Sequence, residues 1–420
     1  MPQNLTERGI KMGYKETLLS PVQIGGLVSR NRFFAQPMEC VDSDAEGNPT
    51  EKTLQRYENL YKGKFGFVDL EAITVTNESR ARKTQLAIMP RNEKALTKFI
   101  RALKEIDPSI PIVFQLTHSG EISKTEFSRR VTVKPLPGLG GELLSDEDVD
   151  TIIDNFAEAA KIAQAAGADG IDLKFCHGYL GSQILRPYND RKWKYGGSWE
   201  NRSRFAYDLM ERIQRATNAG KNFILGSKLS LWEGFPGGCG SAGPDSPLMD
   251  LTEPLDLVKG LEERGACYFI ESLGNVHASR NFVEAVQNEP YLSYLHFYFA
   301  NLLKQHVRPE TVVIGSSFSP FQGMKNKLLA VEPEKSSLFA IGARCIEDGM
   351  MDMIGLGRQS LADPFTPLKL KEGREEEIRY CTQCMNCEEL MRRQRPVGCV
   401  LYNKPYTESF REMRHLLLKG

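Results

Sequence analysis

Residues 170–205 read GIDLKFCHGYLGSQILRPYNDRKWKYGGSWENRSRF, and this stretch decides the fold. Its first residues, Gly170–Lys174, form a short apolar-rich run that predicts a buried strand. Three side chains that can donate a proton, those of Lys174, His177 and Tyr179, lie at or just after its end. Enzymes built on parallel β/α units carry their catalytic groups at the carboxyl ends of the strands. The stretch therefore predicts an active site on a β/α scaffold.

Short β-rich segments alternate with helical patterns along the whole chain. The helix predicted over Asp148–Ala166 has apolar residues at three- and four-residue spacing, with Ser145 before it and Gly167 after it. Eight strand–helix units argue for one α/β domain, a (β/α)8 TIM barrel, although the length alone would suggest about two or three domains. The predicted strands are Arg32–Gln36, Phe67–Ile73, Ile112–Thr117, Gly170–Lys174, Ile224–Ser230, Tyr268–Ser272, Val312–Ser316 and Met353–Gly357.

The charge balance and the lack of long apolar runs narrow the class of protein. The sequence has 54 Lys and Arg residues against 54 Asp and Glu residues, which argues against a nucleic-acid or anionic-membrane partner. No apolar run approaches the ~18 residues that a membrane span needs, and residues 1–15 lack a signal-peptide core. We therefore expect a cytoplasmic protein, in which thiols are kept reduced.

Four of the nine cysteines fall within 381–399 and indicate a metal site. Cys381, Cys384, Cys387 and Cys399 give the spacing C-x2-C-x2-C-x11-C, which suits a [4Fe–4S] cluster and, equally, a structural zinc site. We assign them to a C-terminal four-cysteine segment, residues 369–420, that follows a barrel formed by residues 1–368. This segment is predicted to begin with a charged helical run over Lys369–Arg379.

Alternation along the strand at Gly170–Lys174 places two charged residues on one face. Asp172 and Lys174 share that face, while Ile171 and Leu173 share the other. The aliphatic pair suits the helix-covered outside of a barrel, so the charged pair is predicted to point into its mouth. A buried lysine is costly unless it is paired or functional. Lys174 is therefore either a catalytic group or the partner of Asp172 in a structural ion pair.

Four motifs resemble the old yellow enzyme family of FMN-binding barrels. They are LLSPVQIGGLVSRNRFFAQPM at 18–38, QLTHSG at 115–120, HGYL with YGGSWENRSRF within 177–205, and GLGRQSLADP at 355–364. The likeness runs from Leu18 to Pro405, in order and at barrel spacing. The sequence is most similar to the iron–sulfur branch of that family, which includes 2,4-dienoyl-CoA reductase and trimethylamine dehydrogenase. This resemblance favours a [4Fe–4S] cluster over zinc.

The resemblance implies catalytic roles for four residues. Lys174 and His177 match the two donors that bind the substrate carbonyl oxygen, although the family usually has His at the first position. Tyr179 matches the proton-donating tyrosine; without the motif it would be interpreted as a core tyrosine at the strand end. His277, in GNVHASR, matches a histidine that assists proton transfer in the dienoyl-CoA reductase branch, and a surface-loop histidine is the alternative.

The resemblance also implies a set of FMN contacts. A (β/α)8 barrel binds phosphate at the loops after its last two strands, and small residues with an arginine suit that role. Gln115 matches the glutamine at the pyrimidine edge of the flavin, and Lys228 stands where the family has Arg near the flavin N1–C2 oxygen. Pro37, Met38 and Glu39 would pass the N5 edge, where Glu39 is unusual. The implied contacts are Pro37, Met38, Glu39, Ala72, Gln115, Lys228, Gly315, Ser316, Ser317, Gly357 and Arg358.

These residues together predict an ene-reductase. Reduced FMN would pass hydride to the β-carbon of an α,β-unsaturated carbonyl compound (an enone, enoate or enoyl-CoA), and the cluster would relay electrons to the flavin. The family's larger members continue into a pyridine-nucleotide domain, whereas this sequence ends at residue 420 and has no GxGxxG after a strand. We therefore expect reduction by external NAD(P)H or by a separate electron-donor protein.

Two other functions remain open from the sequence. An amine dehydrogenase resembling trimethylamine dehydrogenase is one, although the charge of Lys174 would repel a cationic substrate. The other is a non-catalytic electron-transfer subunit with a decayed flavin site, a reading that Glu39 and Lys228 keep open. Both a monomer and a homo-oligomer are compatible with the sequence.

Overall fold

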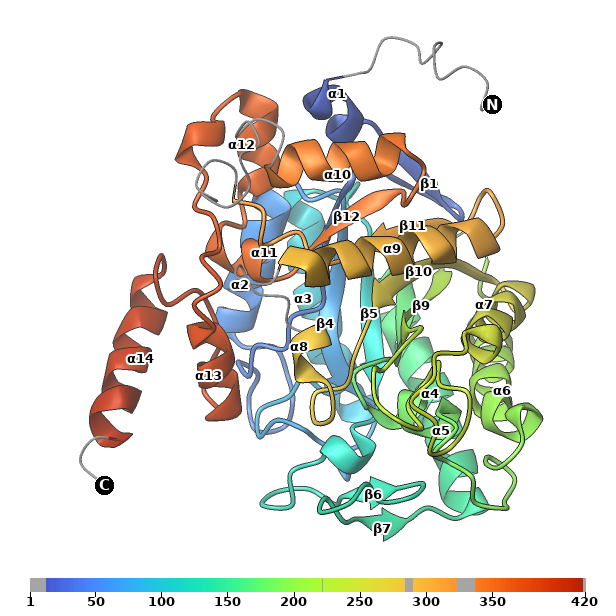
Figure 1. Ribbon diagram of the computed structural model, residues 1–420. Helices are drawn as coiled ribbons and strands as arrows, with labels where there is room; N and C mark the ends of the chain where they lie inside the picture. The colour runs from blue at the N-terminus through green and yellow to red at the C-terminus, as the bar shows by residue number, and fades with distance from the viewer. Residues whose placement is uncertain (1–12, 221, 284–289, 323–336, 418–420) are drawn as a thin grey trace, which may run out of the picture.

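Eight parallel strands form a closed barrel in the computed structural model, which describes residues 13–220, 222–283, 290–322 and 337–417 (Figure 1). This confirms the predicted fold class. Each strand begins and ends within two residues of its predicted limits. In barrel order the strands are β3 (Phe33–Ala35), β4 (Phe67–Thr74), β5 (Ile112–Thr117), β8 (Gly170–Phe175), β9 (Ile224–Ser230), β10 (Ala266–Ser272), β11 (Val312–Gly315) and β12 (Met353–Leu356), which pairs with β3.

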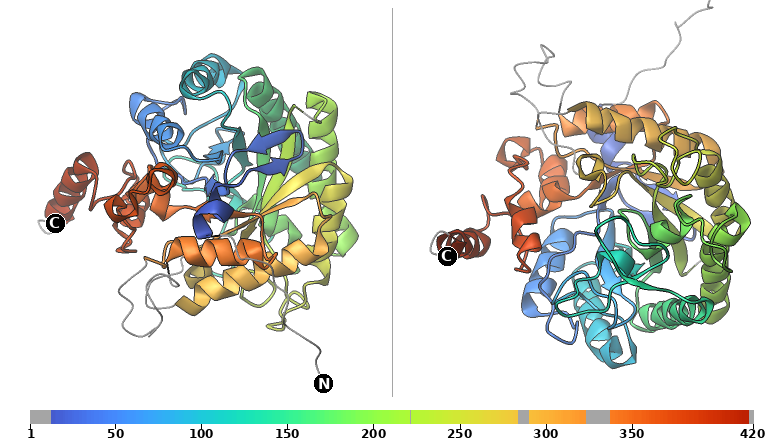
Figure 2. Two further views of the ribbon diagram at one scale, coloured as in Figure 1. Left: turned by 90° about the horizontal axis from the view of Figure 1, so that it is seen from above. Right: turned by 60° about the horizontal axis from the view of Figure 1, so that its bottom comes forward.

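Helices surround the barrel, as the two turned views show (Figure 2). Helix α4 begins two residues earlier than predicted, because Ser145 caps it by accepting a hydrogen bond from the backbone N–H of Asp148. The outer helices are α2 (Glu51–Lys62), α3 (Glu93–Ile106), α4 (Asp146–Ala165), α6 (Trp199–Thr217), α7 (Thr252–Glu263), α9 (Pro290–His306) and α10 (Leu338–Glu347).

The two faces of β8 follow the alternation predicted from the sequence. Ile171 and Leu173 are fully buried in the large core cluster between strands and helices. Asp172 and Lys174 point to the barrel interior and are also buried. At the opposite end, the hairpin of β1 (Val22–Ile24) and β2 (Leu27–Ser29) covers the barrel floor, where Ile24 packs on the interior aromatic cluster. The open end of the barrel is thus the carboxyl end of its strands.

The C-terminal segment departs from its predicted secondary structure. The helix predicted over Lys369–Arg379 ends early: α12 spans Thr366–Glu372 and stops at Gly373, whose φ of 71° is left-handed. The predicted boundary between residues 368 and 369 falls inside α12, whose Leu370 packs in the main core.

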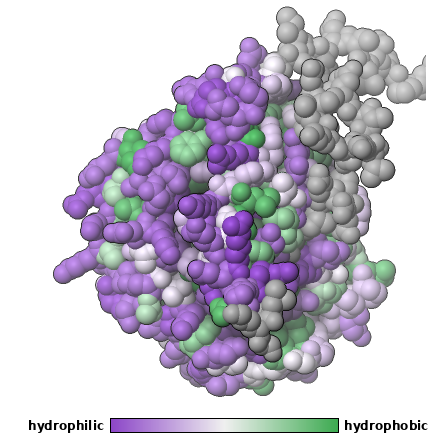
Figure 3. Space-filling model, turned by 90° about the vertical axis from the view of Figure 1, so that its left-hand side faces the viewer, coloured by the Kyte–Doolittle hydropathy of each residue, from purple (hydrophilic) through white to green (hydrophobic). Residues whose placement is uncertain are grey.

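Beyond α12 the chain forms α13 (Asn386–Arg392) and α14 (Lys404–Leu417), which project from the side of the barrel (Figure 1). The face that carries them is largely hydrophilic (Figure 3). Within the described part of the chain, none of the helices combines the length and the apolar character that crossing a bilayer requires.

Candidate active site

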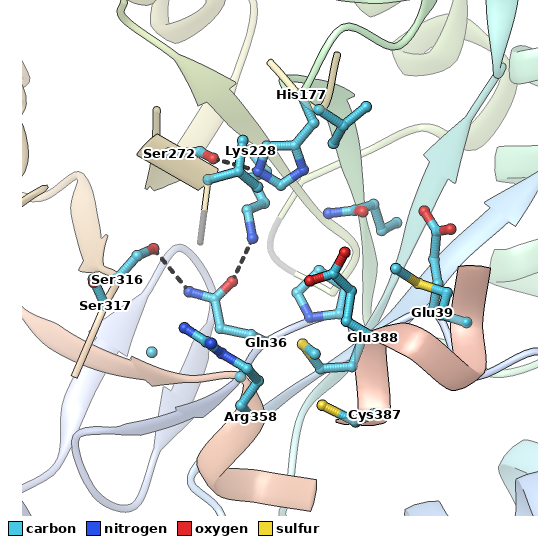
Figure 4. A pocket seen from close by; sticks show the side chains of 18 of the residues that line it. Gln36, Glu39, His177, Lys228, Ser272, Ser316, Ser317, Arg358, Cys387 and Glu388 are labelled. Carbon is cyan, nitrogen blue, oxygen red and sulfur yellow. Dashed lines mark hydrogen bonds between the residues drawn. The ribbon is translucent and has the colours of Figure 1, made fainter. Parts of the chain in front are cut away.

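A pocket lies at the carboxyl ends of the barrel strands, as the sequence predicted (Figure 4). Its walls come from the ends of β3, β5, β8, β9, β10, β11 and β12 and from α13. The predicted residues that line it are Pro37, Met38, Glu39, Gln115, Lys174, His177, Tyr179, Lys228, Ser316, Ser317, Gly357, Arg358 and Cys387. Residues from both halves of the chain therefore meet in one site.

Glu39 binds both Lys174 and Tyr179 in the wall of the pocket. The Lys174 ammonium lies 2.8 Å from Glu39 Oε1, and the Tyr179 hydroxyl donates to the same oxygen at 2.8 Å. Arg82 Nε lies 3.1 Å from the second carboxylate oxygen, Oε2. The Lys174 ammonium also lies 3.5 Å from the centroid of the Tyr179 ring, a cation–π contact. Among the described residues Lys174 pairs with Glu39, so the alternative ion pair with Asp172 is wrong.

The contacts of Glu39 fix the protonation of this group. Burial alone would raise the pKa of Glu39, but Lys174 and Arg82 outweigh it and lower the pKa to about 2. Burial opposes the charge of Lys174, and the Glu39 carboxylate overcomes it and raises the lysine pKa. Burial and the Glu39 charge together raise the pKa of Tyr179 to about 12. At neutral pH the site therefore holds a carboxylate, an ammonium and an intact phenol.

His177 faces the pocket as a neutral imidazole. Its backbone has a left-handed φ of 62°, which turns the chain sharply after β8, and its Nε2 lies 2.7 Å from the Ser272 hydroxyl. Burial and then the charges of Lys228 and Lys174 hold the pKa of His177 well below its ordinary value. A neutral ring keeps one N–H donor, whose place on Nδ1 or Nε2 depends on the tautomer.

The opposite wall of the pocket is a polar cradle suited to a flavin phosphate and ring edge. Lys228 Nζ donates to Gln36 Oε1 at 2.7 Å, and Gln36 Nε2 donates to the Ser316 hydroxyl at 3.0 Å (Figure 4). A Cβ added to Gly355 would meet Gln36 Nε2 at 2.2 Å, so a side chain there would displace the Gln36 amide from this position. Together with Ser317 and Arg358 this wall offers hydroxyls and cations, which fit an anionic cofactor such as FMN.

Gln115 lies at the base of the pocket, on β5. Its Nε2 donates to Asp172 Oδ2 at 2.5 Å. Asp172 and its neighbour Asp69 are both fully enclosed, and burial raises the pKa of each carboxyl. The amide is therefore held in one orientation by the barrel interior, with its side chain at the pocket surface.

Three of the predicted catalytic and flavin-binding residues are not among those that line this pocket. Ala72 lies within β4, and its carbonyl accepts from Gln85 Nε2 at 3.0 Å. Gly315 packs against Met351 behind the cradle. His277 lines a separate hollow with Tyr188 and Phe235. The structure therefore does not bring these three residues together with Tyr179 in the pocket.

The pocket residues that sequence reasoning missed include the polar residues Gln36, Arg82, Ser272 and His296. Gln36 and Ser272 are the last residues of predicted strands, so the strand-end rule could have found them. Arg82, in a loop, and His296, inside α9, carried no such signal. The two nitrogens of His296 face two acceptors, Glu271 Oε1 at 2.9 Å and the Phe282 carbonyl at 2.8 Å. Burial opposes its charge, yet Glu271 outweighs it and raises the His296 pKa.

The four cysteines line one small cavity beside the pocket. Cys381, Cys384, Cys387 and Cys399 share it with Arg358 and Met385. Burial raises the pKa of Cys387 to about 12, with a further rise from the neighbouring Cys381 and a smaller opposing effect from the charge of Arg358. Across the described ranges, no three His, Cys, Asp or Glu side chains are arranged to hold a metal ion. The four thiols nevertheless line one cavity, and thiolates are ligands that suit both an iron–sulfur cluster and zinc.

A protein-family model matches the part of the chain that contains most of the motifs described above. The model of the NADH:flavin oxidoreductase / NADH oxidase family matches residues 17–245, more than half of the chain. That range includes the loop after β3, the base residue Gln115 and the catalytic candidates after β8.

Three relatives are similar over 89% of the chain. They are an NADH oxidase of Thermoanaerobacter brockii, 28% identical over 53% of that protein; a probable N-methylproline demethylase of Rhizobium meliloti, 26% identical over 51%; and a cinnamate reductase of Clostridium sporogenes, 27% identical over 55%. The chain spans about half the length of the curated relatives it matches.

The fold is also shared with solved structures. A 2-naphthoyl-CoA reductase in complex with 2-naphthoyl-CoA superposes with a TM-score of 0.78 at 19% identity, over 94% of this chain and 58% of that chain. At this identity the likeness concerns the fold alone.

Proposed function

Because the chain belongs to the NADH:flavin oxidoreductase / NADH oxidase family, we propose that it is an FMN-dependent oxidoreductase that reduces the C=C bond of an α,β-unsaturated carbonyl compound. The observation that carries this proposal is the pocket wall in which an intact phenol, a neutral imidazole and an ammonium face one space opposite an anion-binding cradle. The cinnamate reductase relative, which acts on such a bond by its name, supports the same chemistry.

Each group has a task in this reaction. FMN, once bound and reduced, supplies a hydride to the β-carbon of the substrate. The N–H of His177 donates to the carbonyl oxygen and stabilises the charge that develops there. Tyr179 gives its hydroxyl proton to the α-carbon. With a pKa of about 12 the phenol is protonated at neutral pH and is available as a general acid when the enolate forms. A direct contact between Lys174 and the carbonyl oxygen stays a prediction, because the Lys174 ammonium forms an ion pair with Glu39 in this structure.

The charge of the pocket favours this function over amine oxidation. The probable N-methylproline demethylase relative supports an amine substrate, and Glu39 would suit an ammonium group if it were free. Glu39 is instead shared by Lys174 and Arg82, and Lys228 adds a further cation to the lining. A substrate ammonium would be repelled by this lining, whereas an enolate oxygen is stabilised. Parallel assays with N-methylproline, 2-cyclohexenone, cinnamate and crotonyl-CoA decide between the two.

Arg358→Ala should weaken the retention of FMN without unfolding the barrel. Arg358 lines the cradle beside Ser316 and Ser317, where the arginine would add a charge-assisted contact to the phosphate. The measurement is the FMN content after gel filtration, together with the melting temperature of the flavin-free protein. A wild-type protein whose acid-released cofactor contains no FMN would refute the cofactor assignment, and a variant with undiminished flavin would refute the role of Arg358.

We further propose that the four cysteines hold a [4Fe–4S] cluster that supplies single electrons. Cys387 lines both the cysteine cavity and the pocket, so a cluster there would adjoin the flavin site. Electrons would enter from external NAD(P)H at the flavin or from an electron-donor protein at the cluster.

Anaerobic preparation should yield about four iron and four sulfide per chain. Cys384→Ser should remove most of this iron, because each thiolate supplies one ligand, and should leave the barrel folded. The measurement is iron and sulfide analysis with the visible spectrum, and the Cys345→Ser variant, outside the cysteine segment, is the control. About one zinc per chain without iron or sulfide would contradict the cluster.

A further inference from the structure

One buried unit in the pocket wall consists of Glu39, Lys174, Arg82 and Tyr179. The proposed reaction gives a task to Tyr179 but none to Glu39 or Arg82. The Lys174 and Glu39 side chains are 5% and 8% exposed. Oε1 of Glu39 meets both Lys174 and Tyr179, and Oε2 meets Arg82. Three elements far apart in the chain supply these groups: the loop after β3, the loop after β4, and β8 with the turn after it.

Two unusual residues thus explain each other. Glu39 and Lys174 each depart from the residues expected at their positions, and they are partners in one ion pair. A buried charge of either sign would be costly alone, whereas the pair keeps both. The carboxylate also fixes the position of the ammonium, because Lys174 is held above the Tyr179 ring while the phenol hydroxyl is held on the same oxygen.

We propose that Glu39 is a positioning residue for proton transfer by Tyr179, and that through it Lys174 serves Tyr179 rather than the substrate oxygen. This inference rests on the proposed ene-reduction.

The charges of the unit balance after the proton has moved. Two cations and one carboxylate give the unit a net charge of plus one while Tyr179 is a phenol. In the transfer step the O–H bond of Tyr179 breaks and a C–H bond forms from the electron pair of the substrate enolate. The phenolate that remains brings the unit to neutrality, and the nearby ammonium offsets its charge. A proton from water then restores the phenol.

Loss of Glu39 should lower the pKa of Lys174, so that the loss of its proton becomes visible in the pH profile of the activity. The charged and titratable groups around its ammonium are Glu39 from the loop after β3, Tyr179, Cys176 and His177 from the turn after β8, Lys228 from β9 and Asp69 from β4. Burial is the largest influence on the Lys174 pKa and lowers it, and Glu39 is the largest influence that raises it. Without Glu39 the lysine should lose its proton at a lower pH, so the activity should fall on the basic side.

Glu39→Gln is the first variant, measured on the flavin-loaded full chain with whichever of 2-cyclohexenone, cinnamate and crotonyl-CoA the wild type reduces. We expect kcat to fall on the order of 10²-fold with KM little changed, and a new basic limb in the pH profile of kcat. Lys174→Met should lower kcat similarly, and the double variant should be no worse than either single variant, since both act through one unit.

Asp169→Asn is the matched control. It breaks the ion pair of Asp169 with Lys104, whose 2.5 Å contact lies just before β8 at the opposite end of that strand. This variant should keep the wild-type kcat and pH profile.

Thermal unfolding of the flavin-free protein provides a readout that is independent of turnover. Each single variant should lower Tm, and the double variant should recover much of the loss, because both buried charges are then gone. Additive losses would overturn the pairing. A Glu39→Gln variant with a lower KM and an unchanged kcat would overturn the inference as well, since a freed Lys174 would then be binding the substrate. A wild type that reduces none of the three compounds refutes the proposed function instead.

Discussion

Replacing Tyr179 with Phe should lower the turnover of a reducible enone by about 10²–10⁴-fold, the usual contribution of a general acid. The change keeps the aromatic ring, which is 2% exposed and packs on Ala81 and Ile122, and removes only the hydroxyl. The hydroxyl donates to Glu39, which keeps its other contacts with Lys174 and Arg82. The loss should therefore appear in chemistry rather than in folding.

Two measurements separate this result from a general defect. Flavin content and reduction of the flavin by dithionite should equal those of the wild type, because neither needs the phenol. Single-turnover mixing of the reduced protein with the substrate should then show the slowed step directly. A Tyr179→Phe protein with full turnover on every enone tested would remove Tyr179 from the role of proton donor.

Replacing Arg186 with Ala should cause the largest loss of stability, about 3–5 kcal/mol. Arg186 is 1% exposed and lies between two buried carboxylates, with Nη1 at 3.0 Å from Glu121 Oε1 and Nε at 3.5 Å from Glu233 Oε2. Glu233 also accepts from Asn275 Nδ2 and from the backbone of Cys239, each at 3.0 Å. Without the guanidinium the two carboxylates would stay enclosed without a cation between them, which the fold tolerates poorly.

Urea unfolding of the two flavin-free proteins measures this loss as the difference in unfolding free energy. Arg129→Ala is the control, because its 2.7 Å pair with Glu142 is exposed and such pairs contribute about 0–1 kcal/mol. Equal stabilities for Arg186→Ala and Arg129→Ala would show that the buried carboxylates are neutral or reach water without the arginine.

The barrel could be predicted from the sequence because its strands are short apolar runs bounded by turn residues. On β8 the alternation also predicted which residues face inward, since side chains along a strand point to opposite faces in turn. The end of the same strand also drew attention to Tyr179, whereas Lys228 was predicted from the family resemblance. The charged helical run predicted over Lys369–Arg379 was wrong beyond Glu372, because Gly373, with a left-handed backbone, ends the helix.

The contacts within the site could not be predicted in the same way. Glu39 and Lys174 are 135 residues apart, and only the folded barrel brings their side chains to 2.8 Å. The sequence therefore marked them as two separate departures, although physically they are one compensated pair. His277 shows the opposite error, since a short local likeness assigned it to the pocket while the turn after β10 directs it to another hollow.

The seam between β12 and β3 sets the order in which the protein can become functional during synthesis. Leu356 pairs with Ala35, so β3, the first barrel strand to be synthesised, cannot complete its pairing until β12, the last one, has been made. One wall of the cradle follows β3 and another follows β12, and neither forms a pocket without the other. A nascent chain that does not yet include β12 should be unable to bind its cofactor. Loading is therefore expected to be a late, post-translational event, and the long-range closure should make it slow.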